Sequence, residues 1–159
     1  MANIIPTRPR YLGPQRRNYA IVASQYHPAL VQGLVEHFEK ELDAIVPGAN
    51  ISRHEVPGAF EIPVMVQEVA AAGSADAIVA FGVVIEGETH HAQFLGQAVT
   101  NALMDCALRY RIPVVHEVLV VRNEEQARVR CLGDELNRGT EAARTAVRIA
   151  QSISEFKNR

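Results

Sequence analysis

The stretch Ala77-Ile78-Val79-Ala80-Phe81-Gly82-Val83-Val84-Ile85 decides the fold, because its nine residues are almost entirely apolar. A strand of a parallel sheet that helices cover on both faces is apolar along its whole length. The run is also short and bounded by polar residues, as a buried strand is. It therefore predicts a central parallel strand at residues 77–85.

Shorter apolar runs and segments with helical spacing alternate on both sides of this strand. Pro28 suits the first position of a helix, because that position needs no N–H donor. The spacing also places Phe94 on the buried side of a helix. The pattern predicts further strands at 19–23, 50–56 and 113–121, and helices from 28 to near Gly48 and at 60–72, 89–110, 124–130 and 139–156. Strands separated by helix-length segments predict an α/β fold, a three-layer α/β/α domain with a four-stranded, doubly wound parallel sheet.

The first 17 residues differ from the rest of the chain. They hold Pro6, Pro9 and Pro14 together with four arginines, and prolines at this spacing prevent a helix. We therefore predict an extended N-terminal arm at 1–17 and a single domain at 18–159. The arm is either a disordered tail or a segment that reaches a neighbouring subunit.

Composition excludes several classes of protein. Apolar residues make up 48% and charged residues 21% of the chain, which excludes a disordered protein. The net charge of −2 is unlike that of a general nucleic-acid binder. No run reaches the roughly 18 apolar residues that span a bilayer, and the polar N-terminus lacks the apolar core of a signal peptide. Cys106 and Cys131 make no disulfide framework. These features predict a cytoplasmic protein that binds neither nucleic acid nor membranes.

The candidate site lies where the strands end, because an open parallel sheet binds ligands at the carboxyl ends of its strands. The loops that follow the four strands are 24–28, 56–61, 86–91 and 122–124. Together they carry two aromatic residues, several carboxylates and three histidines. Tyr26 and Phe60 either belong to the core or offer flat faces to a ring. Glu61 either complements a helix dipole or accepts hydrogen bonds from ligand hydroxyls.

The turn Gly87-Glu88-Thr89 is a candidate anion site. Free N–H groups at a helix start favour a phosphate, although Thr89 could instead be a simple N-cap. The next two residues, His90 and His91, point about 100° apart on a helix, so they would not chelate one metal ion. We therefore expect no metal site. One histidine could carry a proton, or both could be plain surface residues.

Three linked motifs identify a family. They are Val56-Pro57-Gly58-Ala59-Phe60-Glu61-Ile62-Pro63, then Gly82 to His91, and finally Glu125 to Arg130 with Asn137 to Ala143. In order and spacing they resemble the 6,7-dimethyl-8-ribityllumazine synthase family. The resemblance implies a flavodoxin-like fold. It also implies a transferase of riboflavin biosynthesis that condenses 5-amino-6-(D-ribitylamino)uracil with 3,4-dihydroxy-2-butanone 4-phosphate, releasing phosphate and water without a cofactor.

The same resemblance assigns roles to particular residues. It makes His91, rather than His90, the catalytic proton carrier. It places phosphate at Gly87, Glu88 and Thr89, with Arg130 reaching it from the adjacent subunit. It assigns the pyrimidine and ribityl chain to a set of substrate-binding residues: Tyr26, Phe60, Glu61 and Ile85, with His116 closing the pocket from a neighbour.

The resemblance also implies a homo-oligomer built on pentamers, with active sites between subunits. The linker at 131–137 lacks the glycine-rich pattern of sixty-subunit shells, so a pentamer or a pair of pentamers is favoured over a shell. An alternative is a flavin- or lumazine-binding protein of the same fold without turnover. A signalling receiver domain would need an acidic cluster after the first strand, and Ser24-Gln25-Tyr26-His27 offers none.

Overall fold

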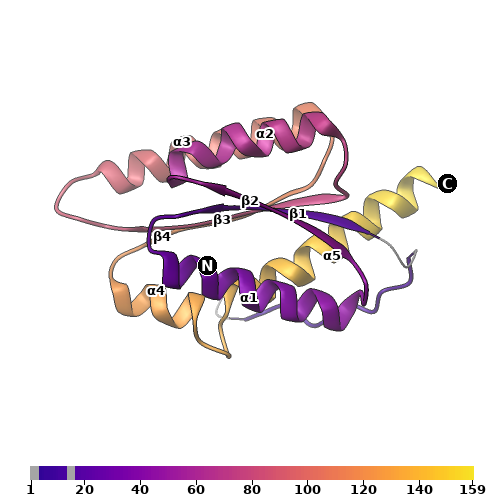
Figure 1. Ribbon diagram of the computed structural model, residues 1–159, viewed down its shortest axis with the longest axis horizontal. Helices are drawn as coiled ribbons and strands as arrows, with labels where there is room; N and C mark the ends of the chain where they lie inside the picture. Colours follow the sequence, from indigo (N-terminus) through magenta and orange to yellow (C-terminus); the bar gives the residue numbers. More distant parts are fainter. Residues whose placement is uncertain (1–3, 14–16) are drawn as a thin grey trace.

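The computed structural model describes residues 4–13 and 17–159 and shows an α/β domain (Figure 1). Its elements alternate along the chain as the sequence predicts. They are β1 (Asn18–Ser24), α1 (Pro28–Ile45), β2 (Asn50–Val56), the short 3₁₀ helix η1 (Ala59–Glu61), α2 (Ile62–Ala72), β3 (Ala77–Ile85), α3 (His91–Tyr110), β4 (Val114–Val121), α4 (Glu124–Cys131) and α5 (Arg138–Lys157).

The four strands form one parallel sheet in the order β2-β1-β3-β4. The chain winds outward to β2 on one side of β1 and to β3 and β4 on the other. The winding direction therefore reverses between β1 and β3, and ligands of doubly wound sheets bind at such a switch point. The predicted three-layer, flavodoxin-like fold is confirmed.

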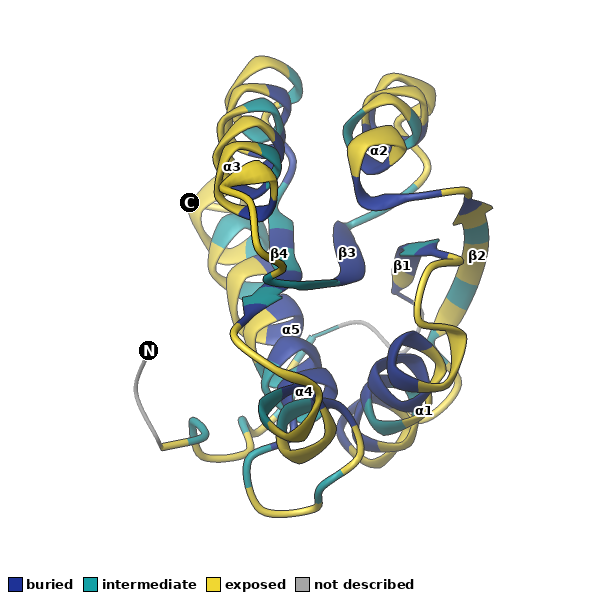
Figure 2. Cartoon of the chain, turned by 90° about the vertical axis from the view of Figure 1, so that its left-hand side faces the viewer, coloured by how far each residue is buried: buried dark blue, intermediate teal, exposed yellow. Residues whose placement is uncertain are grey.

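Helices cover both faces of the sheet, as the layers in Figure 2 show. One layer contains α1, α4 and α5, and the other contains α2 and α3. The central strand β3 contributes Val79 and Phe81 to the first core and Ile78 and Ala80 to the second. Its uninterrupted apolar sequence follows from this double burial, since neither face meets water.

Close backbone contact joins α1 to α5. A Cβ atom on Gly139 would lie only 2.1 Å from the carbonyl oxygen of Leu34, so glycine is required there by space. Asn137, fully buried, caps α5 by accepting hydrogen bonds from the N–H groups of Gly139 and Thr140. The cap and the glycine together set where α5 begins and how closely it approaches α1.

Two details of α3 differ from the prediction. The helix begins at His91 rather than Thr89, because no side chain at its N-terminus caps it and the buried positions begin only at Ala92. Phe94 was expected on the buried side, but its side chain is 73% exposed. Ala92, Gly96 and Val99 face the sheet instead, so Phe94 lies on the opposite side of the helix.

Residues 4–13 of the predicted arm have no regular secondary structure and lie along α1 and α5 of their own chain; residues 1–3 and 14–16 fall outside the described part. Arg8 donates two hydrogen bonds of 2.8 Å to the carboxylate of Glu41, and Arg144 donates a third to it. Arg144 also donates to the carbonyl of Pro6. The bond from Arg8, followed by the bond from Arg144, lowers the pKa of Glu41 to about 2 against the opposing effect of burial.

Candidate functional site

A pocket of about 490 Å³ opens at the carboxyl ends of β1 and β3, on the side of the sheet covered by α2 and α3. This is the switch point of the sheet. The pocket brings together five of the residues that the sequence predicts for the site. Its lining consists of Tyr26, His27, Gly58, Ala59, Phe60, Glu61, Val83, Val84, Ile85, His91 and Leu95.

Two aromatic side chains stand at this pocket without being part of the core. Tyr26 follows β1 and is 69% exposed, and Phe60 lies in η1 and is 65% exposed. The alternative that they are core residues is therefore wrong. Leaving two such rings in water is unfavourable, and rings of this kind stack well on another flat ring. The pocket is thus suited to a planar heterocycle.

Glu61 brings a carboxylate to the same wall, and Gly58 makes room for it. A Cβ on Gly58 would lie 2.9 Å from Glu61 Oε2 and 3.5 Å from the ring of Tyr26. The backbone of Gly58 is extended, with φ −142°, so backbone strain does not call for glycine, and a Cβ there would displace the end of the Glu61 side chain. An ionised carboxylate only accepts hydrogen bonds, so it suits a ligand rich in hydroxyl groups.

The structure separates the two adjacent histidines. His91 is the first residue of α3 and lines the pocket, whereas His90 precedes the helix and does not. Both side chains are exposed. An imidazole with access to solvent and to a bound ligand can exchange a proton near neutral pH. Of the pair, only His91 lies where a ligand would meet it.

The turn Gly87–Thr89 lies immediately before α3 and does not itself line the pocket. Its three residues are exposed, and a Cβ on Gly87 would meet no atom within 4 Å. The alternative that Thr89 is a simple N-cap is wrong, because the helix begins at His91 and its cap position is His90. The first N–H groups of α3 still point toward this turn, as those of any helix do.

Two predicted residues lie outside the pocket of their own chain. Arg130 is in α4 and donates a hydrogen bond of 3.3 Å to the carbonyl of Gln126. His116 is in β4 and bonds to Thr100 of α3. Both belong to the set that the resemblance assigns to a neighbouring subunit, so a single chain does not test their roles.

Sequence reasoning did not assign Gly58, Val84 and Leu95 to the site. Val84 lies one residue before Ile85 on a strand already predicted, and Leu95 lies one turn after His91 on the same helix. Helix periodicity therefore contained the signal for Leu95, whereas adjacent residues of a strand face opposite sides, so periodicity would not have grouped Val84 with Ile85. The role of Gly58 depends on the position of the Glu61 carboxylate, which no local pattern contains.

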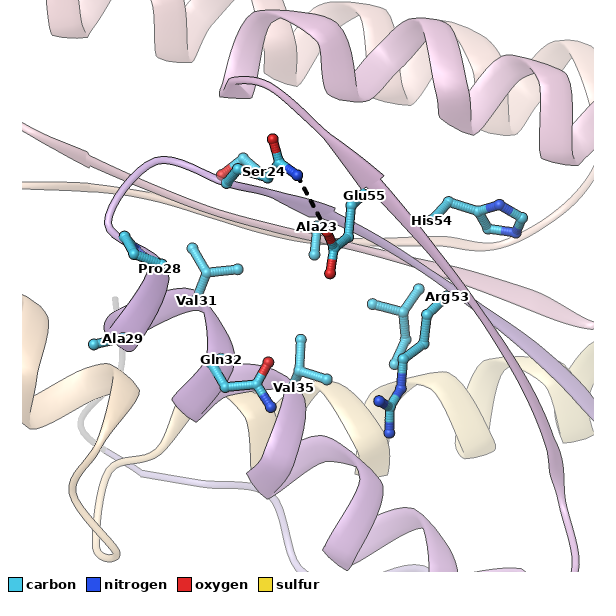
Figure 3. A pocket seen from close by; sticks show the side chains of 12 residues that line it. Ala23, Ser24, Pro28, Ala29, Val31, Gln32, Val35, Arg53, His54 and Glu55 are labelled. Carbon is cyan, nitrogen blue, oxygen red and sulfur yellow. Dashed lines mark hydrogen bonds between the residues drawn. The ribbon is translucent and has the colours of Figure 1, made fainter.

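A second cavity, of about 600 Å³, lies between α1 and the edge strand β2 (Figure 3). It contains none of the predicted site residues. Most of its charged groups are already paired, since Gln25 donates to Glu55 at 3.1 Å and Arg53 donates twice to Glu39 at 2.5 Å. Although this cavity is the larger one, the smaller pocket gathers the groups that can do chemistry, and we take that pocket as the candidate site.

The described residues contain no cluster of three or more histidine, cysteine or acidic side chains that could hold a metal ion. Across the same residues, no helix is both long enough and apolar enough to cross a membrane.

The location of the pocket defines a class of protein. Doubly wound sheets with a pocket at the switch point are typical of proteins that bind small molecules. A histidine and a carboxylate on the wall of that pocket add groups for proton transfer and hydroxyl recognition. The chain thus has the architecture of a flavodoxin-like, small-molecule enzyme.

Comparison with known proteins narrows this class to one family. The family model described as 6,7-dimethyl-8-ribityllumazine synthase matches residues 16–154. Proteins of that name from Paraburkholderia phymatum, Polaromonas sp. and Cytophaga hutchinsonii are 37%, 32% and 37% identical to this chain. The matches cover 82%, 91% and 86% of this chain and 74%, 92% and 87% of those proteins. The chain belongs to the 6,7-dimethyl-8-ribityllumazine synthase family, which confirms the family identified from the three sequence motifs.

Proposed function

We propose that the chain is a cofactor-independent transferase of riboflavin biosynthesis. It condenses 5-amino-6-(D-ribitylamino)uracil with 3,4-dihydroxy-2-butanone 4-phosphate to form 6,7-dimethyl-8-ribityllumazine, phosphate and water. The observation that carries this proposal is the pocket at the switch point, which gathers Tyr26, Phe60, Glu61 and His91 in a chain of this family. Holding two reactants side by side removes much of the entropic barrier to their condensation.

Each wall of the pocket suits one part of the pyrimidine substrate. The exposed rings of Tyr26 and Phe60 offer stacking surfaces, and Ile85 adds an apolar wall. The Glu61 carboxylate accepts hydrogen bonds from the ribityl hydroxyls. Imine formation, phosphate elimination and ring closure all require proton transfers, and His91, which lines the pocket, would perform them.

Phosphate binding extends the site toward the turn Gly87–Thr89. The butanone phosphate would lie between this turn and Arg130 of an adjacent subunit. At Glu88 the backbone N–H is the useful group, because its carboxylate would repel a phosphate. A guanidinium binds phosphate through paired, charge-assisted hydrogen bonds. Among residues 4–13 and 17–159, Arg130 donates one hydrogen bond, to the backbone carbonyl of Gln126, which leaves most of its donors for such a contact.

Assembly would complete the site in a cytoplasmic homo-oligomer built on pentamers. One chain presents the pyrimidine wall, whereas Arg130 and His116 lie away from it. We divide the chain into an arm at 1–17 and a domain at 18–159. The edge strand β2 of the domain, beside the second cavity, could pair with the extended arm of a neighbouring chain (Figure 3). In this chain the arm lies on α1 and α5, so reaching a neighbour would require releasing Arg8 from Glu41.

A direct assay tests the proposed function. Purified protein is mixed with both substrates and the absorbance of the lumazine is followed, while light scattering gives the size of the assembly. Formation of lumazine at a rate proportional to protein concentration is expected. Binding of the pyrimidine without product would instead identify a lumazine- or flavin-binding protein without turnover. Full activity in a folded monomer would contradict the shared site.

A further inference from the structure

His116 is held within its own chain by both of its ring nitrogens. The backbone N–H of Val118 donates a hydrogen bond of 3.1 Å to His116 Nδ1. On the other side of the ring, His116 Nε2 lies 2.8 Å from the hydroxyl oxygen of Thr100 on α3. The imidazole therefore spans the gap between an edge strand and the helix that begins with His91.

The partners of these two nitrogens fix the position of the ring proton. Nδ1 accepts from a backbone N–H, so it carries a lone pair. The single hydroxyl proton of Thr100 is donated to the carbonyl of Gly96 at 2.7 Å, so the Thr100 oxygen can only accept from His116. Nε2 must then carry the proton. The lone pair on Nδ1 excludes the imidazolium, and the contact with Thr100 agrees in placing the proton on Nε2, so the ring is the neutral Nε2–H tautomer.

The backbone around this contact is arranged for it. The backbone carbonyls of Pro113 and Val121 accept hydrogen bonds from the N–H groups of Ile78 and Glu86. The backbone N–H and C=O groups of the odd-numbered residues of β4 therefore point toward β3. The N–H of Val118 consequently points to the free edge, where the imidazole satisfies it. On α3, a Cβ on Gly96 would lie 2.7 Å from Val120 Cγ2. The helix thus approaches β4 closely at Gly96, one turn before Thr100.

We propose that His116 is a positioning residue: as a neutral Nε2–H imidazole it latches α3 to β4 and takes no part in proton transfer. Thr100 lies nine residues after His91 on the same helix, about 13 Å along its axis, so the latch holds the helix that presents the catalytic histidine. Burial lowers the pKa of His116, which favours the neutral ring. What the ring can offer to a neighbouring pocket is its carbon edge and face. The inference rests on the proposed function in one respect, because one of its readouts is the rate of lumazine formation.

The tautomer can be measured directly on the full-length, assembled protein. Long-range ¹H–¹⁵N spectra of ¹⁵N-histidine-labelled protein, with His116→Gln to assign the signals, are expected to show a protonated Nε2 and an unprotonated Nδ1 at pH 7. An imidazolium or the Nδ1–H tautomer would overturn the proposal. This measurement does not depend on lumazine formation. A wild-type protein that forms no lumazine would contradict the proposed function, and the spectra would still test the tautomer of His116.

A matched pair of variants tests the latch. Thr100→Val keeps the shape and removes the acceptor, whereas Thr100→Ser keeps the hydroxyl. We expect Thr100→Val to give a mixture of His116 tautomers and a roughly two- to tenfold lower kcat, the range for losing one hydrogen bond, and Thr100→Ser to retain both properties. Identical behaviour of the two variants would overturn the latch. Loss of a limb of the pH–rate profile in His116→Gln would show that His116 carries a proton, and would overturn the positioning role.

Discussion

The two helical layers differ in the contacts between their helices and in the apolar surface that they expose. The layer of α1, α4 and α5 is held by charged contacts, with Glu41 bridged to Arg8 and Arg144, and by the contact of Gly139 with α1. The layer of α2 and α3, with η1 before it, leaves large apolar side chains in water. These are Phe60, Val64, Phe94, Met104 and Leu108.

The difference separates two tasks. The first layer also exposes Val129 and Phe156, but its charged contacts and the contact of Gly139 with Leu34 join its helices within the chain, so changes at these contacts should act on folding. The second layer contains the candidate pocket and keeps apolar surface for a ligand or another subunit, so changes there should act on the reaction. A variant in one layer should therefore leave the property of the other layer unchanged, unless its side chain serves a neighbouring subunit.

The largest effect is expected for His91→Ala, which removes the proton carrier. The rate of lumazine formation should fall by roughly 10²–10⁴, the usual contribution of general acid–base catalysis. Residual activity should remain, because the reactants are still held in position. The unfolding midpoint should not change. His90→Ala is the matched control and should be mild; equal rates for the two variants at saturating substrate would refute the assignment.

Arg130→Ala should be the exception, since Arg130 lies in the first layer but is proposed to bind phosphate in the site of a neighbouring subunit. Losing a charge-assisted contact to phosphate costs about 1.5–3 kcal/mol. The KM for the butanone phosphate should therefore rise by about ten- to a hundredfold, and that for the pyrimidine much less. Arg128→Ala, whose guanidinium pairs with exposed Glu124, is the control. Equal increases in both KM values would argue against a phosphate contact.

Gly139→Ala should destabilise the fold and leave the KM values unchanged. Replacing a helical glycine by alanine normally stabilises a protein, because alanine favours the helix. Here the new Cβ would meet the Leu34 carbonyl, and overpacking of this kind costs about 1–3 kcal/mol. Urea unfolding at constant m-value measures the change. A higher midpoint would mean that α1 and α5 can separate freely.

The smallest effect is expected for Glu41→Gln, which weakens the attachment of the arm by about 1 kcal/mol or less after solvent screening. Since its pKa is lowered to about 2, Glu41 stabilises the fold above its ordinary pKa near 4.5, and this stabilisation is lost as the pH falls toward 2. The variant should flatten that part of the stability profile. Trypsin should also cleave faster after Arg10. Glu39→Gln, which removes the partner of exposed Arg53, is the control; equal cleavage rates in the two variants would exclude a role of Glu41 in holding the arm.

Most of the fold could be predicted because its signals are local. The apolar run of β3, the proline that begins α1 and the alternation of elements all act within a few residues. The pocket could be located because the ends of parallel strands converge. The contacts of Glu41 with Arg8 and Arg144 could not, since they join residues far apart in the sequence. Phe94 was misplaced because an exposed aromatic on a helix breaks the amphipathic pattern from which burial is inferred.

The dependence of α1 on α5 also has a consequence during synthesis. Leu34, Phe38 and Leu42 are fully buried, and four alanines of α5, near the end of the chain, pack in the same core. At 5–20 residues per second, a ribosome needs about 5–20 s to extend the chain from Ile45 to Ala150. The segments that form the pocket, from β1 to α3, are therefore synthesised before α5, which packs on the apolar side of α1. During that interval α1 is the segment most in need of a chaperone.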